Sequence, residues 1–134
     1  MKEIIHIKVR GYHIDLYGHV NNTRYLEFLE EARWTIKEKY FDFMHEHAKG
    51  LGIVVVSNHI DYHHAATLGD ALEIRTCISR IGNKSAVFRH EIYLADTDTL
   101  VVDAEVTFVI MDFNTGRAIP LSEEWRTRLE LLLE

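Results

Sequence analysis

A long run of strand-like alternation, from Leu51 to Met111, limits the folds open to this chain. Apolar and polar residues alternate through most of the run, as they do in half-buried strands. Three short turns divide it, at 67–70, 82–83 and 96–98. Because short turns join antiparallel neighbours, the run predicts four consecutive strands of a mostly antiparallel sheet. In the first of them, 53–56 is continuous and β-branched, so we expect it to be partly buried on both faces.

The residues before this run predict one strand and one long helix. Residues 2–10 alternate apolar and charged side chains, which indicates another half-buried strand. From Asn22 the apolar period becomes that of a helix, and the charged side chains of this segment, Arg33 among them, are expected elsewhere around it. The apolar stripe consists of Tyr25, Leu29, Ala32, Ile36, Tyr40 and Phe43.

The ends of the helices complete a fold prediction. The long helical region is expected to break near 40–42 and to end at Gly50 or Gly52. Ser122 is a plausible N-cap for a short last helix. An antiparallel sheet can show one face to water but must cover the other, and the long helix is the available cover. We therefore predict an α+β fold, a curved antiparallel five-stranded sheet wrapped around one central helix, with a short C-terminal helix.

Composition predicts a single globular domain and excludes some partners. The chain has 134 residues, so we expect one domain over 1–134. Its net charge of −6 makes nucleic acid and anionic membranes poor partners, because affinity for both comes from cations. A single cysteine, Cys77, excludes an internal disulfide framework. With no signal-peptide pattern and no long apolar run, we expect a cytoplasmic protein.

The segment 11–25 is the densest polar stretch, and it leads directly into the long helix. A helix start offers free backbone N–H groups and a positive dipole end, which together suit an oxyanion. Asp15 precedes that start, and a carboxylate facing such N–H groups suffices for acyl-group hydrolysis. Spacing alone favours a simpler interpretation, in which Asp15 is a turn-former and Asn21 or Asn22 is the N-cap of the helix.

A family resemblance favours the catalytic interpretation. It is carried by the run Asp15-x-x-Gly18-His19-Val20-Asn21-Asn22-x-x-Tyr25. This run resembles the signature of hot-dog-fold acyl-CoA thioesterases of the 4-hydroxybenzoyl-CoA thioesterase superfamily. The blocks 8–13 and 25–34 are most similar to its FadM-type long-chain acyl-CoA thioesterases. The resemblance covers most of the chain and implies a thioesterase that acts on medium-to-long acyl chains and needs no cofactor.

The resemblance also implies roles for individual residues. The family's catalytic carboxylate falls on Asp15, as nucleophile or as general base. The oxyanion donor falls on the backbone N–H near Asn22, and Gly18 would permit the tight loop between them. His19 either orients that loop or packs within it.

Substrate contacts and assembly follow from the same resemblance. Hot-dog domains pair edge to edge, so we expect a homodimer or homotetramer with its active site at the subunit interface. Ser57 and His59 of one subunit would then approach Asp15 of the other. Tyr25 lies in the helix–sheet seam that can house an acyl chain. Contacts to coenzyme A, with ordinary surface polarity as the alternative, are expected from His64, Lys84, Ser85 and Arg89.

Other functions fit the sequence less well. Zinc ligands must converge within about 2 Å of the metal, and neither His45 with His47 nor His59 with His63 has suitable spacing, so we predict no metal site. No Gly-x-Ser-x-Gly motif marks a serine nucleophile. The remaining alternatives are a thioesterase acting on acyl-carrier protein and a non-catalytic acyl-binding or assembly module.

Overall fold

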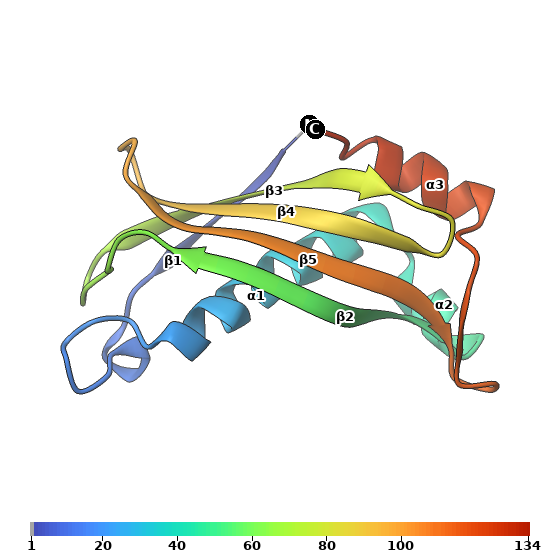
Figure 1. The fold of residues 1–134 in the computed structure, drawn as a ribbon, viewed down its shortest axis with the longest axis horizontal. Coiled ribbons are helices and arrows are strands. Elements are labelled where there is room, and N and C mark those ends of the chain that lie inside the picture. The colour runs from blue at the N-terminus through green and yellow to red at the C-terminus, as the bar shows by residue number, and fades with distance from the viewer. Residues whose placement is uncertain (1) are drawn as a thin grey trace.

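The computed structural model describes residues 2–134, and it shows one curved antiparallel sheet with a long helix on its inner face (Figure 1). The strands are β1 (Glu3–Lys8), β2 (Leu51–Tyr62), β3 (Ala71–Ile81), β4 (Ser85–Leu94), β5 (Leu100–Asp112) and β6 (Arg117–Ile119). The helices are α1 (Asn22–Tyr40), α2 (Phe43–Ala48) and α3 (Glu123–Glu130), with a 3-10 turn at Gly11–His13. The predicted α+β class and helix-wrapped sheet are confirmed.

The sheet has six strands, one more than the sequence predicts. The order is β1-β3-β4-β5-β2, and β6 pairs with the end of β5. β6 is only three residues long, so it shows no alternation from which a strand could be predicted. It forms because the turn at 114–116 folds the chain back on residues 110–112.

The long helix begins and ends where the sequence predicts. Asn21 caps α1, and its side chain accepts a hydrogen bond from the Thr23 N–H. The helix stops at Tyr40, and α2 starts after Asp42, whose carboxylate caps the His45 N–H. Gly50 then adopts φ of 81°, which favours glycine because a Cβ would be strained there.

The core lies between α1 and the concave face of the sheet. The predicted stripe is buried at Tyr25, Leu29, Ala32 and Ile36, while Tyr40 is half-buried and Phe43 belongs to α2. Arg33, expected away from the apolar stripe, is also buried, and its side chain contacts His90 of β4. The charge of Arg33 therefore sits inside the helix–sheet layer.

The expectation for residues 53–56 is correct for Ile53 and Val54, which are partly buried, and wrong for the next two residues. Among residues 2–134, β5 is the one strand that pairs with β2, so β2 forms an edge of the sheet. Val55 is 36% exposed and Val56 is 56% exposed on this edge strand. A register shift between Val55 and Ser57 marks a bulge at Val56.

The C-terminal segment closes the other side of the sheet. Ser122 caps α3 as predicted, accepting a hydrogen bond from the Trp125 N–H. Beyond α3, the backbone of 132–134 pairs with Ile78 in β3. Among residues 2–134, no helix is both long and apolar enough to cross a membrane.

Candidate active site

The polar segment 11–21 folds into a closed loop at one end of the sheet (Figure 1). Its neck is held by an antiparallel bridge between Ile14 and Val20. The Asp15 N–H donates to the His19 carbonyl at 2.9 Å, and the Asn21 N–H donates to the His13 carbonyl at 2.9 Å. These bonds fix Asp15 at the neck of the loop, one residue before the position where it turns.

The carboxylate of Asp15 is held by the tip of its own loop. Its Oδ1 accepts the Tyr17 N–H at 2.9 Å, and its carbonyl accepts the Gly18 N–H at 3.1 Å. Gly18 has φ of 76°, a backbone conformation in which other residues are strained. The turn-forming role considered for Asp15 is therefore real. It occupies one carboxylate oxygen, and within residues 2–134 Oδ2 has no hydrogen-bond partner.

At the start of α1, the backbone N–H of Asn22 is open. The side chain of Asn21 accepts both the N–H and the hydroxyl of Thr23, at 3.0 and 2.8 Å. The Arg24 N–H donates to the Asn21 carbonyl at 2.9 Å. Within residues 2–134, no acceptor lies on the Asn22 N–H. Asn21 is thus the N-cap, and Asn22 supplies an open amide at the positive end of the helix.

A second loop, 63–70, packs beside the first. The Val20 N–H donates to the Ala66 carbonyl at 2.9 Å, and His19 bridges to Thr67. The Ala66 N–H donates to the hydroxyl of buried Tyr25 at 3.4 Å. Burial raises the pKa of Tyr25, so this phenol stays neutral. The second loop therefore holds in place the backbone segment that carries Asp15 and Asn22.

Tyr62 is a site residue that sequence reasoning missed. It is the last residue of β2, and its hydroxyl donates to the Asn22 carbonyl at 3.1 Å. Its ring lies 5.7 Å from that of Tyr25. Tyr62 thereby ties the edge strand to the first turn of α1. A tyrosine at a strand end carries no signal for this contact, which joins residues 40 positions apart.

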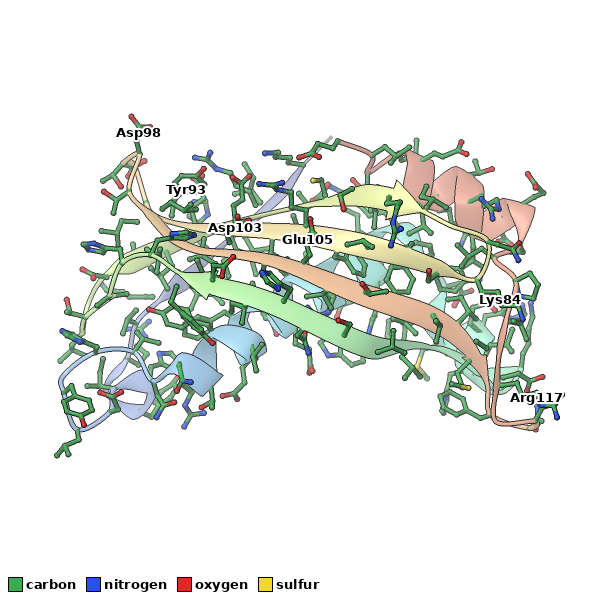
Figure 2. All side chains as sticks on the ribbon, viewed as in Figure 1. Lys84, Tyr93, Asp98, Asp103, Glu105 and Arg117 are labelled. Atoms are coloured by element: carbon green, nitrogen blue, oxygen red, sulfur yellow. The ribbon has the colours of Figure 1, made fainter. Side chains whose placement is uncertain are left out.

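The predicted substrate-binding residues are divided between two ends of the molecule. Tyr25 and His64 lie near the loop at 11–21, Tyr25 in the core and His64 on the surface. Ser57 and His59 lie along exposed β2. Lys84 and Ser85 stand at the β3–β4 turn, at the opposite end of the sheet from that loop (Figure 2).

Arg89 is engaged with carboxylates on the convex face of the sheet. Its guanidinium lies 3.6 Å from Asp103 and 3.8 Å from Glu134. Burial opposes its charge, but the carboxylates outweigh that effect and raise the pKa of Arg89. Across residues 2–134, no group of three or more histidine, cysteine or acidic side chains could hold a metal ion.

Comparison with known proteins identifies the family. The thioesterase-like superfamily profile matches residues 9–129. The chain belongs to the thioesterase-like superfamily. This membership confirms the hot-dog fold and makes the chain a thioester hydrolase. The signature at 15–25 falls on the closed loop and the start of α1.

Individual members of the superfamily are similar over most of their length. The chain is 43% identical to the long-chain acyl-CoA thioesterase FadM of Escherichia coli over 128 residues, 96% of this chain and 97% of FadM. It is 34% identical to the acyl-CoA thioester hydrolase YbgC of Escherichia coli O6:H1, covering 73% of each chain. The solved structure of YbaW, a probable thioesterase from Escherichia coli, superposes with a TM-score of 0.88 at 42% identity, covering 98% of both chains.

Proposed function

We propose that this thioesterase-like protein is a cytoplasmic acyl-CoA thioesterase that releases medium-to-long-chain fatty acids from coenzyme A. Asp15 is its base or nucleophile, and the Asn22 N–H is its oxyanion donor. The observation that carries the proposal is that one end of the fold holds both a carboxylate with an open oxygen and, a few residues later, a helix-start amide with no acceptor among residues 2–134. The similarity to FadM, a long-chain acyl-CoA thioesterase, and to YbgC, an acyl-CoA thioester hydrolase, supports it.

The chemistry follows from these groups. The thioester carbonyl oxygen accepts the Asn22 N–H, which stabilises the negative charge that develops on that oxygen. The Asp15 carboxylate either takes a proton from a water molecule that attacks the carbonyl carbon or attacks that carbon itself. In the first route the carbon–sulfur bond breaks as Asp15 returns its proton to sulfur, and coenzyme A leaves as the thiol. In the second route coenzyme A leaves as the thiolate, which takes a proton from solvent, and water then hydrolyses the acyl-aspartate.

Assembly through β2 is part of the proposal. Unpaired strand edges are prone to add another strand, and the exposed apolar stretch Val55–Val56 lies in the middle of this edge. Two copies paired antiparallel along β2 form a continuous sheet across a two-fold axis. That arrangement reverses the second copy, so its Lys84 and Ser85 come to the end that holds Asp15 of the first. Ser57 and His59 then lie along the new seam.

A free-thiol release assay with acyl-CoA substrates tests this function. Asp15→Asn keeps the size of the side chain and its bond to the Tyr17 N–H but removes the negative charge. We expect turnover to fall by about 10²–10⁴-fold, the usual contribution of a positioned base. The matched control is Asp98→Asn, at the exposed tip of the β4–β5 hairpin (Figure 2), which should keep full activity.

Each outcome of this assay bears on the proposal. Undiminished turnover by Asp15→Asn would remove Asp15 from the mechanism. Release of fatty acid from acyl-acyl-carrier protein but not from acyl-CoA would mean that the protein is an acyl-acyl-carrier-protein thioesterase. No release from any thioester would leave an acyl-binding module.

A further inference from the structure

An apolar hollow lies at the end of the molecule opposite the loop that holds Asp15. It has a volume of about 400 Å³ and opens between the end of α1, α2 and the start of β2. That volume is within the usual range of small-molecule sites. We call it the aromatic hollow, because its walls include Trp34, Phe41, Phe43, Phe113 and Trp125.

The charged groups of the aromatic hollow are already engaged. The Lys37 ammonium lies 4.6 Å from the centre of the Trp34 ring, as in a cation–π contact. The carboxylate of Glu46 lies 3.7 Å from the ammonium of Lys49. The remaining walls are mostly aromatic and aliphatic, so an alkyl chain would exchange water for apolar contact there.

The side chains on the seam side of α1 beside Asn22 are buried. Tyr25, Phe28, Leu29 and Ala32 there are each at most 4% exposed. Protein interiors contain few voids larger than a water molecule. The aromatic hollow is, by contrast, an apolar space already open to a long acyl chain.

Within one chain, the aromatic hollow is too far from Asn22 to hold part of an acyl chain whose thioester is bound there. Gly52 lines it, while Tyr62 at the other end of β2 contacts Asn22. Ten residues of strand span about 33 Å, at about 3.3 Å per residue. An antiparallel second copy removes this separation. Pairing centred near Val56 sets Tyr62 of one copy opposite the first residues of β2 in the other, with strands about 4.8 Å apart.

We propose that the aromatic hollow of one subunit holds the distal part of the acyl chain whose thioester is bound at Asp15 of the other subunit. The inference rests on the proposed function and gives it a physical basis for chain length. Each additional buried methylene should improve binding about fourfold, until the hollow is full. Short acyl chains do not reach it.

Intrinsic fluorescence reports directly on this occupancy. Trp34 and Trp125 both line the aromatic hollow, and they are the two tryptophans of the protein. Asp15→Asn protein is titrated with palmitoyl-CoA and with butyryl-CoA, so that binding is measured without turnover. We expect the tryptophan emission to shift with palmitoyl-CoA and to stay constant with butyryl-CoA. An equal response to both, or to neither while both bind, overturns the inference.

A charge placed in the aromatic hollow tests its role in turnover. Met44 lines it and is 64% exposed, so Met44→Glu should leave the fold intact. Leu131→Glu, at an apolar residue that is 55% exposed after α3, is the matched control. We expect Met44→Glu to lower kcat/KM for palmitoyl-CoA by about tenfold or more, since apolar contact is replaced by a charge, and to leave butyryl-CoA unchanged.

The outcomes separate this inference from the proposed function. If Met44→Glu lowers kcat/KM equally for both substrates, or leaves the chain-length profile unchanged, the aromatic hollow does not hold the acyl chain. The proposed thioesterase activity is unaffected by that result. Absence of any thioesterase activity overturns the proposed function, and the fluorescence titration then still decides whether the hollow binds the long acyl chain.

Discussion

His90 of β4 makes the stability of this fold depend on pH. Its ring is fully buried, with Nε2 3.2 Å from Nη1 of Arg33 and Nδ1 2.8 Å from Oγ1 of Thr76. Because a guanidinium only donates, Nε2 accepts, and Nδ1 carries the proton that it donates to Thr76. Burial and the charge of Arg33 hold the pKa of His90 well below its usual value.

The magnitude follows from proton linkage. In the unfolded chain His90 takes up a proton as pH falls below about 6.5, while the folded chain does not. The free energy of unfolding therefore keeps its full His90 contribution above that pH and loses about 1.4 kcal/mol per pH unit below it, until the folded pKa is reached. His90→Gln can accept from Arg33 and donate to Thr76, but it takes up no proton.

Urea unfolding of the wild type and His90→Gln at several pH values measures this difference. All other titrating groups are common to both proteins and cancel. We expect the stability advantage of the wild type at pH 7 to shrink as the pH falls below 6.5, with a limiting slope of about 1.4 kcal/mol per pH unit. His63→Gln, which replaces an exposed histidine on the loop after β2, is the matched control. Parallel curves for His90→Gln would mean that the buried ring accepts a proton in the folded state, and the reasoning would fail.

Three further changes test other parts of the structure. Tyr62→Phe keeps the ring but loses the bond to the Asn22 carbonyl, so we expect kcat to fall with little change in KM; a loss of thermal stability with kcat unchanged would contradict this positioning role. Val56→Lys puts a charge on the free edge of β2, so size-exclusion chromatography should show dissociation and activity should fall with it, whereas an unchanged dimer would place the interface elsewhere. Ser122→Ala removes the hydrogen bond to the Trp125 N–H and should lower the free energy of unfolding by about 1 kcal/mol in urea titrations; no change would show that water replaces the cap.

The parts of the fold that depend on one repeating environment were predictable from sequence. In strands β3, β4 and β5, apolar and polar residues alternate because one face of the sheet packs on α1 and the other faces solvent. The residue types alone therefore show which side of each strand is buried. The start of α1 was predictable for a local reason, since Asn21 reaches the Thr23 N–H from within the same turn. The loop that holds Asp15 was identified by its resemblance to the family signature. This was possible because the bonds that close the loop join residues close in sequence, so one short segment contains the whole loop.

Features that depend on distant residues were not predictable. Arg33 is a charged helix residue, and only its contact with His90, 57 positions away, accounts for its burial. Tyr62 and Asn22 likewise meet across 40 positions. Lys84 and Ser85 lie far from Asp15 within one chain, so any joint action requires a second molecule. The order of residue types along the chain does not show which distant residues contact each other.

The packing of α1 and the openness of β2 have related consequences for substrate length. A helix that buries Tyr25, Phe28 and Leu29 in its seam with the sheet stabilises the fold. Widening the seam would create a cavity and cost stability in proportion to its volume. Space at a subunit boundary avoids that cost, because the chain enters a hollow that the folded subunit already tolerates. In the pairing that we propose, a single hot-dog domain thus keeps its core intact while the second copy determines which substrates fit.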